Sequence, residues 1–315
     1  MALTPPDAGG KIIHSGSLTC SPALSGPEVP MMRAATLRRM TPDDLAFAAS
    51  LTLAENWHSE TLEEFESFFS HAPAGCLIAE QDGRAVAIGV ATPYQDAGFL
   101  GQIVVAPEAR GHGVGSLVVD ALLSCLQHQG VRSVYLDATA AGAPLYQRHG
   151  FRKTQPSLRY SGKVRGAFHA HVRSMRAGDL DQVCSLDRLW WGQDRSFFLK
   201  RRWDLYPDLC HVLEQDDTIA GYVMARRRGE KLWIGPWCAA THVAAPEALL
   251  EALAPPGVEV QVHAGVLASS ARAIHALGCL GLAQSATAPW RMVWGHDAAL
   301  GQRMEILANG TSAKG

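Results

Sequence analysis

The stretch Arg110-Gly111-His112-Gly113-Val114-Gly115-Ser116 decides the fold of this chain. It follows the apolar run Ile103–Ala106, a predicted strand, and precedes residues 117–129, whose apolar side chains fall on one face of a predicted helix. Glycines between a strand and a helix start leave several backbone N–H groups unpaired, and the helix dipole adds positive potential there. The stretch therefore predicts a binding site for a phosphate or pyrophosphate.

Two other glycine motifs can be set aside. A P-loop needs a lysine after its last glycine, whereas Ser116 follows Gly115 here. The dinucleotide fingerprint has a different glycine spacing and lies in the first strand–helix–strand unit of its domain, whereas several predicted strands precede this loop. The pattern that remains is Arg110-x-x-Gly113-x-Gly115.

The first half of the chain is predicted as one strand, two helices, three strands, the glycine loop with its helix, and then strand, helix and strand. An Asp82-Gly83 turn joins the second and third strands. The predicted strands are residues 37–40, 76–80, 85–92, 99–105, 134–138 and 157–161, and the predicted helices are 41–57, 62–69, 117–129 and 143–149.

Three linked motifs give this half a family resemblance. They are the loop itself, its approach at residues 105–111, and the segment Ala143–Phe151, in which Leu145-Tyr146 precedes Gly150-Phe151. At this spacing, residues 34–165 resemble the GNAT family of N-acetyltransferases. The resemblance implies a mixed α/β sheet fold and acetyl-coenzyme A (acetyl-CoA) as co-substrate. It also implies direct transfer to a primary amine of a small molecule in a ternary complex.

The second half of the sequence repeats the first. Residues 37–40 and 44–45 match 172–175 and 179–180, and residues 76–82 match 210–216. We therefore expect two tandem GNAT folds. Thr241–Glu247 replaces the anion loop in the second copy and contains neither Gly-x-Gly nor arginine. We expect this degenerate copy to complete the acceptor pocket or to stabilise the first.

The predicted domain layout has four parts. Residues 1–33, rich in Pro, Gly and Ser, are expected to form a disordered tail, and Met31 or Met32 is a possible true start. The catalytic domain is predicted at 34–165, the degenerate GNAT-like domain at 166–300, and a carboxy-terminal tail at 301–315.

The resemblance also implies roles for individual residues. The backbone of Ile103 and Val105 would pair with the pantetheine arm, and the loop from Arg110 to Ser116 would bind the pyrophosphate. Thr139 would contribute to the cofactor site, although many relatives have asparagine there. Tyr146 matches the family's general acid.

The general base is left open by the sequence. Some family members carry a glutamate on the fourth strand, but Gln102 occupies that region here. The candidates are Glu55, His58 and Asp137, and Asp137 could equally bind a cationic acceptor.

Composition limits the other possibilities. The chain of 315 residues is 18% charged, with a formal net charge of −2, so neither nucleic acid nor a membrane is expected as a partner. No apolar run reaches the ~18 residues of a membrane span. The seven cysteines are scattered and form no C-x-x-C pair, so we expect no metal site. Cysteines of this kind also predict a cytoplasmic location. A homodimer remains possible. Two alternatives to a small-molecule N-acetyltransferase stay open: a non-catalytic acyl-CoA sensor, and a protein or peptide acetyltransferase acting on lysine or the amino terminus.

Overall fold

A computed structural model describes residues 34–57, 60–311 and 313–315. The expected tail at residues 1–33 and the candidate base His58 lie outside these ranges.

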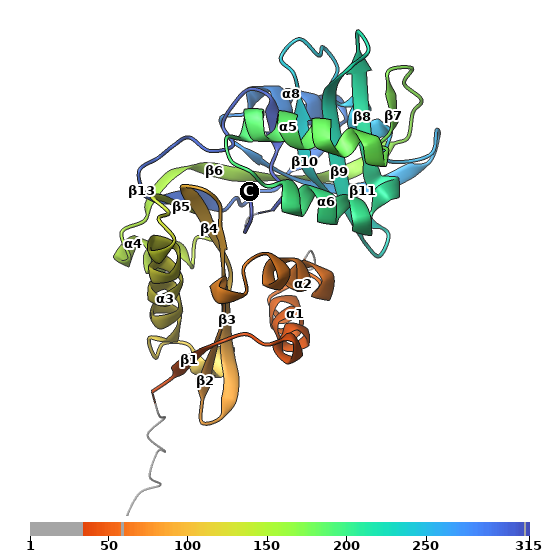
Figure 1. Ribbon diagram of the computed structural model, residues 1–315. Helices are drawn as coiled ribbons and strands as arrows, with labels where there is room; N and C mark the ends of the chain where they lie inside the picture. Colours follow the sequence, from red (N-terminus) through yellow and green to blue (C-terminus); the bar gives the residue numbers. More distant parts are fainter. Residues whose placement is uncertain (1–33, 58–59, 312) are drawn as a thin grey trace, which may run out of the picture. The chain divides into compact units, whose positions relative to one another are not determined.

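The first half has the predicted order of elements (Figure 1). Its bounds are β1 Thr36–Arg39, α1 Leu45–Ala54, α2 Leu62–His71, β2 Cys76–Gln81, β3 Arg84–Pro93, β4 Ala97–Val105, α3 Val114–His128, β5 Ser133–Ala138, α4 Ala143–Arg148 and β6 Arg152–Arg165. Helix α3 begins three residues earlier than predicted, directly after Gly113 in the left-handed conformation (φ 82°). Gly115 and Ser116 therefore belong to its first turn.

The second half repeats this order, with a four-residue helix after its fourth strand in place of the fifteen-residue α3. Its bounds are β7 Val172–Ser174, α5 Leu180–Trp191, α6 Ser196–Leu205, β8 Cys210–Gln215, β9 Thr218–Arg228, β10 Lys231–Ala239, α7 Ala248–Glu251, β11 Glu259–Leu267, α8 Ala271–Cys279, β12 Ala283–Gln284, β13 Trp290–Gly295 and β14 Ile306–Ala308.

The repeat extends to individual ion pairs. In each half, an arginine on the first strand binds the acid that precedes the first α-helix and an acid on the second strand. The two sets are Arg38 with Asp44 and Glu80, and Arg173 with Asp179 and Glu214. The arginine–aspartate distance is 2.6 Å in both sets.

The two halves exchange their last strands. The sheet order is β1-β2-β3-β4-β5-β13-β6-β11-β10-β9-β8-β7, so β13 of the second half lies between β5 and β6 of the first. The other end of β6 pairs with β11 through residues 157–165, and Figure 1 shows β6 running from one half into the other. Each half thus depends on a strand from the other, because backbone hydrogen bonds of a buried strand need a partner.

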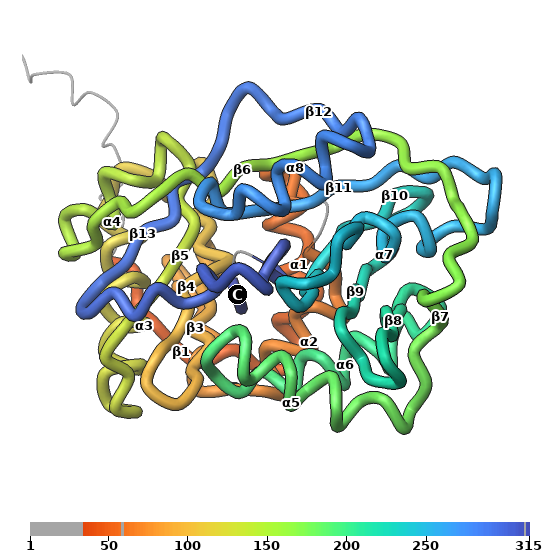
Figure 2. Tube along the Cα trace, turned by 90° about the horizontal axis from the view of Figure 1, so that it is seen from above, coloured from red at the N-terminus to blue at the C-terminus, as the bar shows by residue number. Residues whose placement is uncertain are grey.

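Helices cover both faces of the first half's sheet, with α3 and α4 on one face and α1 and α2 on the other (Figure 1). The chain's last segment runs between the two halves (Figure 2). Ala313 is fully buried there against Gly101, where an added Cβ would lie 2.1 Å from the alanine methyl. Residues 309–311 and 313–315 are thus packed parts of the fold.

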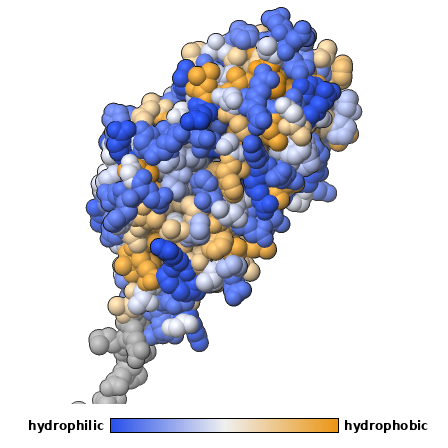
Figure 3. Space-filling model, in the orientation of Figure 1, coloured by the Kyte–Doolittle hydropathy of each residue, from blue (hydrophilic) through white to orange (hydrophobic). Residues whose placement is uncertain are grey.

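The surface seen in Figure 3 mixes hydrophilic and hydrophobic residues. Within the described ranges, none of the helices has the length and apolarity that a membrane crossing requires. The same ranges contain no group of three potential metal ligands among His, Cys, Asp and Glu.

Candidate active site

The glycine loop presents a cluster of backbone N–H groups. Gly111 and Gly113 have φ angles of 80° and 82°, and the space beside each is empty. The N–H of Leu117 donates to the Gly113 carbonyl at 3.0 Å, whereas the amides of residues 111–116 have no acceptor among the described residues. These amides lie at the amino terminus of the fifteen-residue helix α3, which adds its dipole. The loop has the geometry of an oxyanion site.

Strand β4 has an open edge next to this loop. It pairs with β5 only through residues 97–99 and 133–135, and beyond these residues the two strands diverge. Gln102 has a positive φ of 53°, and the pairing of β3 with β4 shifts register beside it. Ile103 and Val105 follow this bulge, so their backbone lies at the edge that β5 has left. An extended ligand could pair with this edge as another strand would.

The second half has no such opening. Strand β14 pairs with β10 at Trp237 and Cys238, the part of β10 that continues beyond its pairing with β11. The side chain of Arg272 on α8 donates to the carbonyls of Ala239 (2.7 Å) and Ala240 (2.9 Å). The four-residue helix α7 stands where the first half has α3. Protein groups therefore fill the region that is open in the first half.

Two side chains of the loop are held by neighbours. Arg110 forms a short ion pair with Glu55, and its Nε–H donates to the Val105 carbonyl at 2.8 Å. Ser116 Oγ lies 2.7 Å from Nε2 of His149, whose Nδ1 lies 2.7 Å from Asp120. His149 fixes the hydroxyl of Ser116 in the first turn of α3. No role was predicted for this histidine, which directly precedes Gly150-Phe151.

Tyr146 on α4 is partly buried against the core of the first half. Its ring packs edge-to-face on Phe151 at 5.9 Å, and burial raises the pKa of its phenol to about 12. The phenol is therefore protonated at neutral pH, and its hydroxyl has no partner in the part of the chain that the structure describes. Nearby, Thr139 Oγ1 accepts the Gly142 N–H at 3.2 Å and so helps to begin α4.

A cavity of about 260 Å³ lies between the two halves. Both halves supply its walls. The lining residues are Glu60, Asp137, Ser157, Arg159, Tyr160, Ser161, Arg226, Trp233, Ile234, His263, Ala264, Gly265, Ser285, Arg291, Asn309, Gly310 and Thr311. Of the predicted catalytic residues, Asp137 lines this cavity, whereas Glu55 and Tyr146 do not.

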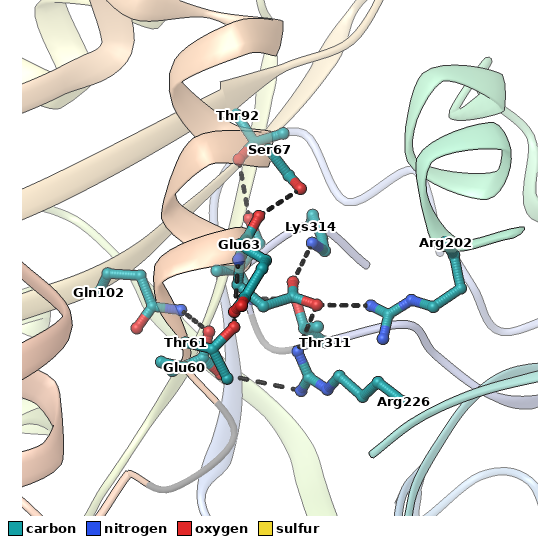
Figure 4. Close-up of polar contacts among 12 residues, drawn as sticks. Glu60, Thr61, Glu63, Ser67, Thr92, Gln102, Arg202, Arg226, Thr311 and Lys314 are labelled. Atoms are coloured by element: carbon teal, nitrogen blue, oxygen red, sulfur yellow. Dashed lines mark hydrogen bonds and ion pairs between the residues drawn. The ribbon is translucent and has the colours of Figure 1, made fainter. Parts of the chain in front are cut away.

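Glu60 is a cavity residue that the sequence analysis did not single out. Its side chain comes from the segment before α2, and only 5% of the residue is exposed. Gln102 Nε2 donates to one carboxylate oxygen at 2.7 Å, and Arg226 lies 3.8 Å from the other (Figure 4). The bulge in β4 therefore holds a glutamate carboxylate beside the open strand edge. In the sequence, the signal for such a residue was Gln102, which stands on the fourth strand where some family members carry a glutamate.

Asp137 is locked by two arginines. It accepts hydrogen bonds from Arg291 (2.6 Å), Arg159 (3.1 Å) and the Ser157 hydroxyl (2.8 Å). Burial alone would raise its pKa, but the charges of Arg291 and Arg159 outweigh burial and lower it to about 2. Such a carboxylate has little proton affinity at neutral pH, which suits a structural anion better than a general base.

We expect Asp137→Asn to destabilise the fold by about 3–5 kcal/mol at pH 7, because Arg291 would stay buried without a counter-charge. An aspartate has a pKa of about 3.9 when unfolded and here about 2 when folded. Its lowered pKa thus stabilises the protein above about pH 4 and stops doing so as pH falls toward 2. Urea unfolding at pH 7 and pH 3 measures both effects. The exposed Asp181→Asn is the control, and equal losses in the two variants would contradict this assignment.

Comparisons with known proteins give the family. The model of the acetyltransferase (GNAT) family matches residues 40–151, and that of an acetyltransferase (GNAT) domain matches residues 183–308. The chain belongs to the GNAT family, with two such domains in tandem, and it is an acyltransferase. The prediction of two tandem GNAT folds is confirmed.

Two curated relatives act as acyltransferases. Holothin acyltransferase from a Pseudoalteromonas species is 28% identical over 221 residues, which cover 68% of this chain and 74% of that one. Mycothiol acetyltransferase from Acidimicrobium ferrooxidans is 40% identical over 107 residues, 30% of this chain and 34% of that one.

Two solved structures share the fold. A proposed acetyltransferase from Pyrococcus horikoshii superposes with a TM-score of 0.75 at 20% identity, over 93% of this chain and 100% of that one. A GCN5-related N-acetyltransferase from Sphaerobacter thermophilus gives 0.58 at 15% identity, over 88% and 97%.

Proposed function

We propose that the amino-terminal domain transfers the acetyl group of acetyl-CoA to a primary amine of a small molecule, by direct attack within a ternary complex. The observation that carries this proposal is the asymmetry between the halves. Only the first half combines unpaired loop amides with an open β4 edge, whereas β14 and Arg272 fill the corresponding region of the second. The names of both curated relatives denote small-molecule acceptors, which supports the acceptor class.

The loop and β4 would hold the co-substrate. The amides of residues 111–116 can donate to its pyrophosphate, and the open edge at Ile103 and Val105 can pair with its pantetheine arm, apart from the Val105 carbonyl, which already accepts the Arg110 Nε–H. Acetyl-CoA supplies an acyl group already activated as a thioester. A backbone N–H of the same edge can donate to the thioester oxygen as negative charge develops on it.

Two side chains would move protons. Glu60 accepts a proton from the acceptor's ammonium group, so that the neutral amine can attack the thioester carbon. Tyr146 donates its phenolic proton to the departing thiolate, because its raised pKa keeps it protonated until that moment. The C–N bond forms as the C–S bond breaks, and coenzyme A leaves as a thiol.

We expect Tyr146→Phe to lower turnover at least about tenfold, a typical loss for a proton donor, while acetyl-CoA affinity stays within about twofold because the ring still packs on Phe151. Steady-state thiol release measures the first value, and calorimetric titration measures the second. Unchanged turnover would remove Tyr146 from the chemistry.

The function itself is tested by thiol release with small amines and with lysine or amino-terminal peptides. Release with small amines supports the proposal. A preference for peptides would favour a protein acetyltransferase. Tight acetyl-CoA binding without release for any acceptor would leave a sensor, and would overturn the proposal.

A further inference from the structure

We infer that the acceptor carries an anionic group, a carboxylate or a phosphate, which Arg159 binds in the cavity while the amine is placed at Glu60. This inference rests on the proposed function and names the substrate class for it.

The positive charge around Asp137 exceeds the negative charge of its carboxylate. This one carboxylate serves two guanidinium groups, Arg291 at 2.6 Å and Arg159 at 3.1 Å. Arg291 is almost fully buried, whereas a third of the Arg159 side chain is accessible and lines the cavity. One negative charge cannot neutralise two positive ones, so this wall keeps one excess positive charge. Such an excess in a low-dielectric wall favours an anion that enters the cavity.

Among the described residues that line the cavity, no acid besides Asp137 is left to neutralise Arg159. Glu60 and Asp137 are the two acids among the cavity-lining residues. Glu60 lies near Arg226, and Glu64 binds Arg226 (3.2 Å), Arg202 (3.1 Å) and Lys314. These two glutamates already face three cations, and so leave no negative charge for Arg159.

Neighbouring groups hold the Arg159 guanidinium in a fixed position. Its NH1 group donates to the hydroxyl of Ser157 at 2.7 Å, and its NH2 group donates to Asp137. The Nε–H has no acceptor among the described residues. On β11, Gly265 gives the guanidinium room, since an added Cβ would lie 3.1 Å from NH1. The guanidinium is thus held in place with a donor left for a ligand.

A second polar group supports a ligand at this place. His263 lies two residues before Gly265 on β11 and stacks on Trp233 at 4.8 Å. Its Nε2 is buried and has no hydrogen-bond partner in the described ranges, and burial lowers its pKa, so the ring is neutral. A buried polar atom of this kind is costly unless a ligand or water satisfies it.

The size of the cavity limits the distance between the amine and the anionic group of the acceptor. About 260 Å³ accommodates a small molecule. An amine at Glu60 and an anion at Arg159 must therefore belong to one short skeleton. Amino acids and aminoalkyl phosphates have this chemistry.

Matched amine pairs test the inference. Leucine is compared with isopentylamine, which lacks only the carboxylate, and phosphoethanolamine with ethanolamine. We expect kcat/KM to be at least about tenfold higher for the anionic member of one pair, because a charge-assisted bond to arginine is added. The pair with the larger ratio identifies the anion as carboxylate or phosphate. Ratios near one in both pairs would overturn the inference.

Arg159→Gln should remove this preference. We expect kcat/KM to fall at least about tenfold for the anionic acceptor and to change less than about twofold for the neutral one, because only the first is bound by the guanidinium. Arg159→Lys should restore part of the loss. Arg165→Gln, an exposed position on the same strand, is the control and should leave both values unchanged. Equal losses for both acceptors in Arg159→Gln would overturn the inference.

A binding measurement separates this inference from the proposed function. Calorimetry with leucine and phosphoethanolamine, in the presence of coenzyme A, measures binding at the anion site without turnover. Binding that Arg159→Gln weakens supports the site even if no amine releases thiol, in which case the proposed function alone fails. Absence of binding by both probes overturns the inference.

Discussion

Replacing Gly113 by glutamate should weaken acetyl-CoA binding at least about 100-fold, since several charge-assisted hydrogen bonds depend on this loop. The new side chain would start at the amino terminus of α3 and place a carboxylate among the amides of residues 111–116. Like charges would then compete for the same donors. Turnover should fall with binding, and calorimetric titration with acetyl-CoA measures the loss directly.

The chain offers a closely matched control for this variant. Gly130 follows the carboxy-terminal end of the same helix, with a φ of 80° and empty space beside it, compared with 82° and empty space at Gly113. Glutamate at either position carries a similar backbone cost of about 1–2 kcal/mol. Gly130→Glu should therefore lower stability by a similar amount and leave acetyl-CoA binding intact. If Gly113→Glu binds as the wild type does, or if binding is found in the second half, the proposed co-substrate site is wrong.

The sequence predicted best the features that depend on residues close together in the chain. The spacing of Gly111, Gly113 and Gly115 between a strand and a helix predicted a loop whose amides are free in the structure. The start of α3 was placed too late, because glycine has poor helix propensity and Gly115 was assigned to the loop. The tandem repeat was also readable, since the same ion-pair residues recur at matching offsets.

The rest of the site depends on long-range contacts that no local pattern records. Glu60 gains its position from Gln102, forty-two residues away. Asp137 was a candidate base because it ends the fifth predicted strand, but its two arginines come from β6 and β13 and lower its pKa. The strand exchange pairs β13 with β5 and so brings Arg291 beside Asp137, 154 residues away, a separation that no local sequence pattern records.

The strand exchange makes the two halves structurally unequal. With β13 and β6 exchanged, the second half contributes walls to a cavity beside the first half's open edge. Its own β10 edge was then available for β14, which satisfies backbone groups that an extended ligand would otherwise bind. The same topology that covers the β10 edge of the second half therefore encloses the cavity beside the first half's open edge.

Glu60→Gln should lower kcat at least about 100-fold at pH 7, the usual range for a lost general base. The amide keeps the size of the side chain but accepts no proton, and acetyl-CoA binding should change less than about twofold because the loop is untouched. The deficit should shrink as pH approaches the acceptor amine's own pKa of about 8–10, since hydroxide in solution then supplies the neutral amine. Thiol release measured from pH 6 to pH 10 tests whether the deficit in kcat shrinks in this way.

Glu66→Gln is the matched control, because Glu66 is a more exposed glutamate nearby on α2 that pairs with Arg201 outside the cavity. It should leave kcat and its pH profile unchanged. A Glu60→Gln deficit that stays constant across the pH range would assign Glu60 to positioning the acceptor through Gln102 and Arg226. A deficit below about threefold would exclude it from proton transfer, since a working base contributes far more.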